Sequence, residues 1–238
     1  MRLDPHRRLR RFFATTPVPC PYLPGGTERK LVVELAGPGS AALFADLSRA
    51  GFRRSHGFAY RPACGGCTKC VPVRIAVDRF VPTRSLRRVT RRNADLRFAI
   101  RPLRATLEQY RLFSAYQHGR HGDGDMATMT AADYRDMVED TPVESWLVEA
   151  RDPNGRLVCC ILADRAVDSL SAVYSFFDPE QPQRSLGTQA VLWLVQAAQR
   201  LRLPYLYLGY WVDGSRTMDY KRRYPALEAL QDGRWQPF

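Results

Sequence analysis

The second half of the chain alternates between a strand-like and a helix-like spacing of apolar residues. Ser169–Phe177 is apolar and aromatic and precedes a turn signal, which predicts a strand. The next segment repeats apolar side chains every 3.6 residues, which predicts a helix with one buried face: Leu186, Ala190, Val191, Leu194, Val195, Ala198 and Leu201. Pro204 ends this helix, and Tyr205–Trp211 predicts a second strand. Together these segments predict a parallel strand–helix–strand unit.

The start of that helix is a candidate ligand site. We expect the Ser185 hydroxyl to cap it, and its free N–H groups suit a phosphate or a developing oxyanion. A glycine at position 187 destabilises the helix by about 1 kcal/mol relative to alanine. A ligand that approaches the backbone closely would explain why glycine is nevertheless present. The layout resembles the N-acetyltransferase fold, whose pyrophosphate loop reads Gln/Arg-x-x-Gly-x-Gly/Ala. Arg184-Ser-Leu-Gly187-Thr-Gln189 matches the first two anchors and departs at the last. A buried helix packed on a sheet would explain the apolar stripe without any ligand.

The remaining pattern predicts an α+β protein with a domain boundary near residue 96. Residues 1–95 are expected to form an N-terminal α/β domain that contains a cysteine cluster, and residues 96–238 an N-acetyltransferase-like domain with a mixed sheet. Further strands are predicted at 31–36, 52–60, 71–77, 96–102, 146–150, 157–163 and 167–177, and helices at 40–51, 84–95, 106–118 and 130–140, with a glycine-rich loop at 119–126.

Composition places the chain among ordinary globular proteins. Apolar residues make up 45% and charged residues 25% of its 238 positions. No apolar run is long enough to span a membrane, and the basic N-terminal segment lacks the apolar region of a secretory signal. We therefore expect a cytoplasmic location, where cysteines are reduced or metal-bound.

Positive charge points to a polyanionic partner. The formal net charge is +12, and all but three of the 36 basic residues are arginine. Five arginines share one face of the helix predicted at 84–95, namely Arg84, Arg87, Arg88, Arg91 and Arg92, with no acidic residue between them. Such a face is either simply solvated or meets phosphates. Five phosphate contacts would give a log–log salt dependence of binding with a slope on the order of −4.

Four cysteines form a candidate metal site. Cys64, Cys67 and Cys70 lie at Cys-x-x-Cys-x-x-Cys spacing, and Cys20 is the other cysteine of this half of the chain. Four thiolates can hold zinc or an iron–sulfur cluster. A second Cys-x-x-Cys pair is missing, so a reduced thiol loop is the alternative. Cys159 and Cys160 are expected in the core.

Catalytic candidates are few. The sequence shows no Ser-His-Asp or Cys-His nucleophile motif. His121 lies in the glycine-rich segment and could act as a base or contact substrate, although exposed loop histidines often do neither. Lys221 follows the second strand and could face the start of the helix, with a surface lysine as the alternative. The aromatic residues of 205–211 are mostly core, and those at the end of the strand could stack on a base.

Several segments together resemble the aminoacyl-tRNA–protein transferase family. They cover roughly residues 17–225 in the expected order, and the bacterial aspartate/glutamate leucyltransferase branch is the closer likeness. The matching segments are Cys20-Pro-Tyr-Leu-Pro24, Thr27-Glu-Arg-Lys30, Gly51-Phe-Arg-Arg-Ser-His56, Tyr60 to Ile75, Arg87 to Asn93, Arg120 to Met126, Ser185-Leu-Gly-Thr188, Tyr207-Leu-Gly-Tyr-Trp211 and Met218 to Lys221. The eukaryotic arginyl branch usually carries Cys-Gly-Tyr-Cys where this chain has Cys20-Pro-Tyr-Leu23, so one thiol of its proposed cluster set is absent here.

The resemblance implies transfer of leucine from leucyl-tRNA to proteins that begin with Asp or Glu, which marks them for degradation by the N-degron route. No cofactor is required for this transfer. Lys221 and His121 are then the expected catalytic residues, and the arginine helix, above all Arg88, Arg91 and Arg92, the expected grip on the acceptor stem. Expected substrate contacts are Ser185, Leu186, Gly187, Thr188, Tyr210, Arg74 and Tyr22. Arginine as donor, an acetyl-CoA-dependent acetyltransferase and a non-catalytic metal-dependent nucleic-acid-binding module remain alternatives. The general base and the arginine that binds the acceptor carboxylate are left open.

Overall fold

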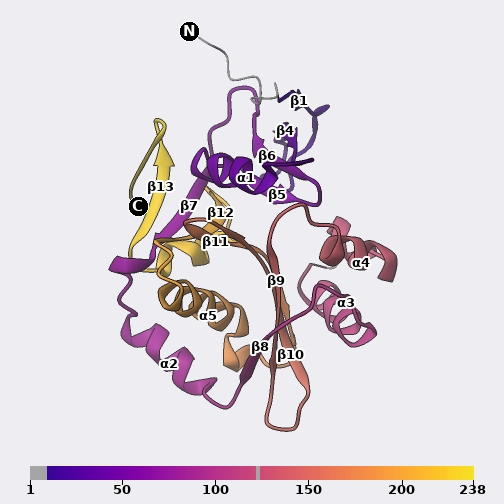
Figure 1. The fold of residues 1–238 in the computed structure, drawn as a ribbon, viewed down its shortest axis with the longest axis vertical. Coiled ribbons are helices and arrows are strands. Elements are labelled where there is room, and N and C mark those ends of the chain that lie inside the picture. Colours follow the sequence, from indigo (N-terminus) through magenta and orange to yellow (C-terminus); the bar gives the residue numbers. More distant parts are fainter. Residues whose placement is uncertain (1–9, 122–123) are drawn as a thin grey trace.

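The computed structural model describes residues 10–121 and 124–238, which form a large and a small β-sheet with helices packed around them (Figure 1). The large sheet has eight strands in the order β14-β13-β7-β12-β11-β10-β9-β8. In chain order these are β7 (Cys70–Ala76), β8 (Arg97–Arg101), β9 (Ser145–Arg151), β10 (Leu157–Ala166), β11 (Ser169–Phe177), β12 (Tyr205–Val212), β13 (Leu227–Gln231) and β14 (Arg234–Pro237).

The predicted parallel unit is confirmed. Strands β11 and β12 pair in parallel, and the other described pairs of the large sheet are antiparallel, so the sheet is mixed as expected. Helix α5 (Leu186–Arg200) makes the crossover between them and buries the predicted stripe, including Leu186, Ala190 and Leu194. Leu201 is the exception, because it follows the last helical residue and is 42% exposed.

Helices cover both faces of the large sheet (Figure 1). Helix α5, with α2 (Arg84–Arg92) packed against it, lies on one face, and α3 (Leu107–His121) and α4 (Ala131–Glu139) lie on the other. One buried cluster joins α5 to the sheet, and a second joins α3 and α4 to its opposite face. Among the helices of the described ranges, none is both long and apolar enough to cross a membrane.

The small sheet sits at one end of the large sheet (Figure 1). Its order is β1 (Phe12–Ala14), β4 (Lys30–Glu34), β6 (Phe58–Pro62) and β5 (Arg53–Ser55), with α1 (Ser40–Arg49) packed nearby and β2 (Val18–Pro19) paired to β3 (Thr27–Glu28). A buried ion pair fastens β5 to β10. Arg54 Nε and Nη2 lie 2.7 and 2.8 Å from the two carboxylate oxygens of Asp164, and both side chains are almost fully buried.

Two predicted elements differ from the structure, and two strands were missed. The strand predicted at 52–60 is a hairpin of β5 and β6, because His56 adopts a φ of 48° and Gly57 follows it in the turn. Strands β13 and β14 were not predicted. Helix α3 continues to His121, into the segment expected as a loop, and residues 122–123 lie outside the described residues.

Strand β7 precedes residue 96 in the chain but pairs with β12 and β13 in the large sheet. The chain therefore passes from the small sheet to the large sheet between Pro62 and Cys70. The domain boundary expected near residue 96 stays a prediction.

Candidate active site

The parallel pairing of β11 and β12 stops early. Ser169–Ser171 lie opposite Tyr205–Tyr207, and no pairing between the two strands continues beyond them, although β11 runs on to Phe177. The register of β12 against β7 is irregular between Tyr207 and Gly209. The two strands therefore separate toward their carboxyl ends. In open α/β sheets this is the edge at which ligands bind.

Arg53 of the small sheet lies where the two strands separate. Its Nη2 donates to the carbonyl oxygens of Ala172 at 3.2 Å and Val173 at 2.8 Å, both on β11. On β12 the guanidinium lies against Gly209, where an added Cβ would come within 2.6 Å of it. Arg53 lies in a segment that resembles the family, but no local sequence pattern shows that its side chain reaches two distant strands.

Lys221 lies beside this arginine. It belongs to the short helix η4 (Asp219–Arg223), is 3% exposed, and its Nζ donates to the carbonyl oxygen of Tyr210. Burial, and secondly the positive charge of Arg53, lower the pKa of Lys221 to about 7. A substantial fraction of this amine is therefore neutral at physiological pH and can accept a proton. The bond to Tyr210 holds the Lys221 side chain against β12; its position relative to the start of α5 stays a prediction.

The start of α5 differs from the expectation in two ways. Ser185 is the residue before the helix, but it adopts a left-handed φ of 54° and its hydroxyl makes no capping bond. A Cβ at Gly187 would lie 2.8 Å from Cε1 of Phe177. The close approach that requires glycine is therefore to an aromatic ring of the same chain. Leu186 is buried in the core, and Ser185 and Thr188 are half-buried.

The C-terminal end of α3 approaches Phe177, the ring that Gly187 contacts. The Arg120 guanidinium lies 5.6 Å from the centroid of the Phe177 ring, and the centroid of the Tyr116 ring lies 4.8 Å from the same point. His121, a predicted catalytic residue, is the last residue of α3, and its side chain lies outside the described part of the structure. Its role stays a prediction.

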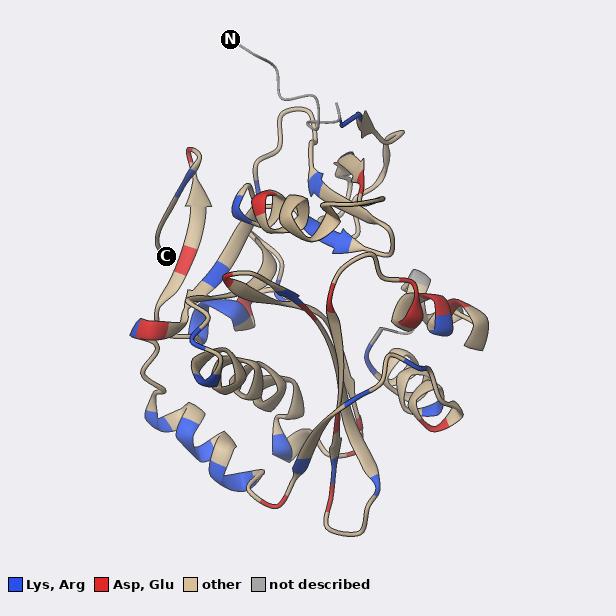
Figure 2. Ribbon diagram, viewed as in Figure 1, with Lys and Arg blue, Asp and Glu red and all other residues tan. Residues whose placement is uncertain are grey.

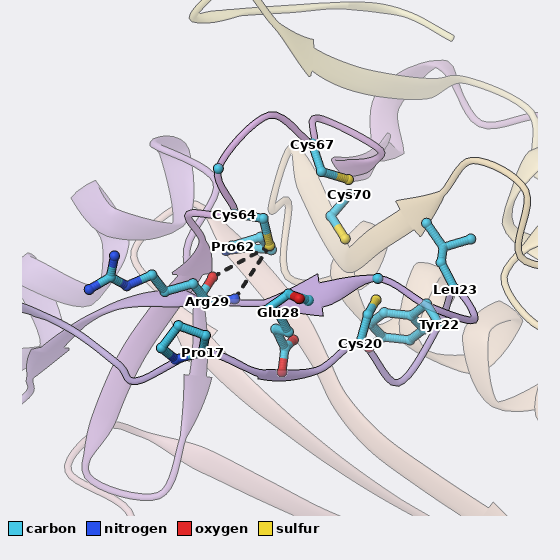
Figure 3. Close-up of a pocket in the computed structure, with 13 residues that line it drawn as sticks. Pro17, Cys20, Tyr22, Leu23, Glu28, Arg29, Pro62, Cys64, Cys67 and Cys70 are labelled. Atoms are coloured by element: carbon cyan, nitrogen blue, oxygen red, sulfur yellow. Dashed lines mark hydrogen bonds between the residues drawn. The ribbon is translucent and has the colours of Figure 1, made fainter.

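The four cysteines line one pocket of about 460 Å³ (Figure 3). Its other lining residues include Tyr22, a predicted substrate contact. Burial, and then Tyr60, raise the pKa of Tyr22 to about 12, while Arg53 acts in the opposite direction. Neither Arg53 nor Lys221 is among the residues that line this pocket.

The thiols of the described residues are not grouped as ligands of one metal ion. Within residues 10–121 and 124–238, no group of three or more His, Cys, Asp or Glu side chains is placed to hold a metal ion. Cys64 Sγ instead contacts the backbone of Arg29, at 3.4 Å from its N atom. Burial and the neighbouring thiols raise the pKa of Cys70 to about 11, so this thiol is neutral at pH 7. Zinc or an iron–sulfur cluster held by Cys20, Cys64, Cys67 and Cys70 stays a prediction.

Two other predicted substrate contacts have partners within the chain. Arg74 Nε donates to Glu228 Oε2 at 2.7 Å, and its guanidinium lies 3.5 Å from the centroid of the Tyr205 ring. The Tyr210 hydroxyl contacts the carbonyl oxygens of Gly51 and Tyr60. Both side chains are buried. Their substrate-binding roles stay predictions.

The helix predicted at 84–95 is confirmed over Arg84–Arg92, and its tRNA-binding role stays a prediction. All five arginines of α2 are exposed, and none forms an ion pair with a residue in the described ranges. Figure 2 shows this basic stripe along the outer side of α2. Asn93 Nδ2 donates to the carbonyl oxygen of Arg184 at 2.8 Å, and Arg92 donates to that of Gln183. These bonds hold the stripe next to the start of α5.

The chain is similar to known proteins along most of its length. The N-terminal and C-terminal sequence models described as arginine-tRNA-protein transferase match residues 18–88 and 108–231. An aspartate/glutamate leucyltransferase from Paramagnetospirillum magneticum is 54% identical over 98% of this chain and 96% of its own length. A second protein of that name, from Granulibacter bethesdensis, is 54% identical over 95% of this chain and 85% of its own length.

A solved structure supports the fold. The crystal structure of FemX matches 85% of this chain, and 69% of its own, with a TM-score of 0.53 at 8% sequence identity. This likeness, together with the mixed sheet and its single described parallel crossover, confirms the predicted N-acetyltransferase-like architecture. The two family models and the close relatives settle the relationship by sequence: the chain belongs to the arginine-tRNA-protein transferase family.

Proposed function

We propose that this chain transfers leucine from leucyl-tRNA to the N-terminal Asp or Glu of acceptor proteins. The observation that carries the proposal is the 54% identity, over nearly the whole length of both chains, to a protein named aspartate/glutamate leucyltransferase. In a cytoplasmic setting the product marks the acceptor for degradation by the N-degron route.

The reaction is aminolysis of an ester. The acceptor's α-amine attacks the carbonyl carbon that joins the amino acid to the tRNA ribose. A C–N bond forms, the C–O bond to the ribose breaks, and the ribose oxygen leaves with a proton. This chemistry needs positioning, a base for the amine proton and stabilisation of the oxyanion, but no covalent enzyme intermediate.

The described residues offer a group for each of these needs. Lys221, with a pKa lowered to about 7, is the base we assign to the amine proton. The backbone N–H groups of Leu186–Thr188, at the start of α5, are assigned to the oxyanion or the terminal adenosine, because the N–H of Ser185 already donates to the carbonyl oxygen of Pro182. The exposed face of α2 lies beside that helix start and is assigned to the acceptor-stem phosphates.

Charge reversal on α2 tests the tRNA assignment. The side chains of Arg84, Arg88 and Arg91 make no hydrogen bond or ion pair with the described residues, so we expect replacing all three by Glu to preserve the packing of α2. The matched control reverses three exposed arginines, Arg104 just before α3, Arg111 in α3 and Arg135 in α4, the two helices that cover the other face of the large sheet (Figure 1). We expect the α2 variant to lose tRNA binding and the salt dependence that goes with it, and the control to keep most of both. Equal losses in the two variants would mean that only net charge matters.

Arginine is the second candidate donor, because the matching family models are described as arginine-tRNA-protein transferase. Parallel assays with leucyl-tRNA and arginyl-tRNA on the same Asp-starting peptide separate the two. Transfer of arginine alone would keep the mechanism and overturn the choice of donor.

A further inference from the structure

Arg53 is a half-buried cation without a carboxylate partner. The two fully buried arginines of the described ranges each have one, Arg54 with Asp164 and Arg74 with Glu228. No described carboxylate forms an ion pair with Arg53 or with its neighbour Lys221. Charged groups taken out of water are normally paired. The unpaired Arg53 therefore makes a site that is incomplete until an anion binds.

The guanidinium of Arg53 is held firmly and keeps donors free. Nη2 is fixed by the carbonyl oxygens of Ala172 and Val173, and the group rests on Gly209. Its Nε–H and Nη1–H groups have no hydrogen-bond partner among the described residues. A planar guanidinium with free donors matches a carboxylate in two-point contact. The anchoring bonds orient it before any ligand arrives.

The acceptor substrate supplies an anion at this position. Its α-amine and its side-chain carboxylate belong to the same residue and are separated by only a few bonds. The group that takes the amine proton and the group that recognises the carboxylate must therefore be neighbours. Lys221 and Arg53 are such neighbours, because Arg53 lies against Gly209 and Lys221 donates to the carbonyl oxygen of the next residue, Tyr210. Arg53 itself lines a hollow with Gly51, Ser171 and Gly209.

A tRNA phosphate is the less suitable occupant. Phosphates are assigned above to the α2 face, whose arginines are exposed and lie beside the start of α5. Arg53 is half-buried, and its electrostatic neighbours include the phenol rings of Tyr60, Tyr210 and Tyr22. Such surroundings fit a small planar anion at the end of a side chain better than a backbone phosphate.

We propose that Arg53, held between β11 and β12, binds the side-chain carboxylate of the acceptor's N-terminal Asp or Glu and so sets the specificity for acidic N-termini. The proposal rests on the transferase function proposed above.

The test compares peptides that start with Asp and with the uncharged isostere Asn. We expect the wild-type kcat/KM for the Asp peptide to exceed that for the Asn peptide by on the order of 10³-fold. In Arg53→Met this ratio should fall below about 10-fold, while tRNA affinity is kept. Arg61→Met removes an exposed arginine from the neighbouring strand β6 and should keep the wild-type ratio. An Arg53→Met enzyme that still prefers Asp as strongly as wild type would overturn the proposal.

A second measurement does not depend on the stability of Arg53→Met. In wild-type protein labelled with ¹⁵N-arginine, the Arg53 Nε–H signal is assigned by its loss in Arg53→Lys. Titration with the Asp peptide should shift this signal, and titration with the Asn peptide should not. An unmoved signal at saturating Asp peptide would contradict the proposal. Absence of leucine transfer by the wild type would count against the proposed function, independently of this titration.

Discussion

Removing Arg54 should destabilise the whole protein through Asp164. Arg54 and Arg53 are consecutive residues of β5 and point to opposite sides of the strand. Arg54 reaches the buried Asp164 on β10 with two short hydrogen bonds, and Ser145 Oγ donates a third bond to that carboxylate at 2.6 Å. The pair thus anchors the strand that presents Arg53. In Arg54→Met the carboxylate stays buried with only the serine as partner.

The expected cost follows from the burial of both partners. Their side chains are 1% and 0% exposed, so water cannot replace the lost guanidinium without rearrangement. Removing one partner of a buried ion pair costs roughly 3–5 kcal/mol. For a chain of this size, 1 kcal/mol corresponds to about 2–4 °C in Tm, so we expect a fall of roughly 6–20 °C. Replacing both residues by apolar ones, as in Arg54→Met with Asp164→Leu, should recover most of that loss.

Urea unfolding followed by circular dichroism measures these changes at pH 7. Arg165→Met is the matched control, because Arg165 pairs with Glu144 at the surface and the two side chains are 40% and 54% exposed. Exposed pairs contribute less than about 1 kcal/mol. A loss below about 1 kcal/mol in Arg54→Met, or a double variant less stable than the single one, would refute the argument.

Two further predictions concern Gly187 and Lys221. Gly187→Ala should lower the free energy of unfolding by about 1–3 kcal/mol in thermal melts despite the better helix propensity of Ala, because its Cβ would meet Phe177. The control Gly57→Ala adds a Cβ that faces open space and should cost little stability. Phe177→Leu should partly rescue Gly187→Ala. Lys221 releases its proton near pH 7 when folded and near 10.5 when unfolded, so its contribution makes the protein more stable as the pH rises between these values. Lys221→Met should remove this contribution, and the stability of wild type relative to the variant should grow by about 2 kcal/mol from pH 7 to 9 in urea melts. A pH-independent difference would show that Lys221 is protonated in the folded state.

Local periodicity was enough to predict the parallel unit, because strand and helix patterns need only neighbouring residues. It also predicted the arginine face of α2, since helical spacing alone decides which side chains share a face. The turn that splits the strand at 52–60 was missed because it depends on a left-handed His56, a residue type that does not demand that conformation.

The candidate site was predicted less completely. Lys221 was identified, but its burial against Tyr210 depends on the packing of η4 on β12. The sequence indicated that glycine at position 187 needs a structural reason. That reason is the ring of Phe177, ten residues earlier in the chain, and not a ligand. The role of Arg53 was not predicted, because its position depends on contacts with residues about 120 and 156 positions away in the chain. No local sequence pattern indicates such contacts.

The most direct test of the account is transfer of radiolabelled leucine from charged tRNA to peptides that start with Asp, Glu or Ala. The account predicts labelling of the Asp and Glu peptides and none of the Ala peptide. Labelling of all three alike, or of none, would contradict it.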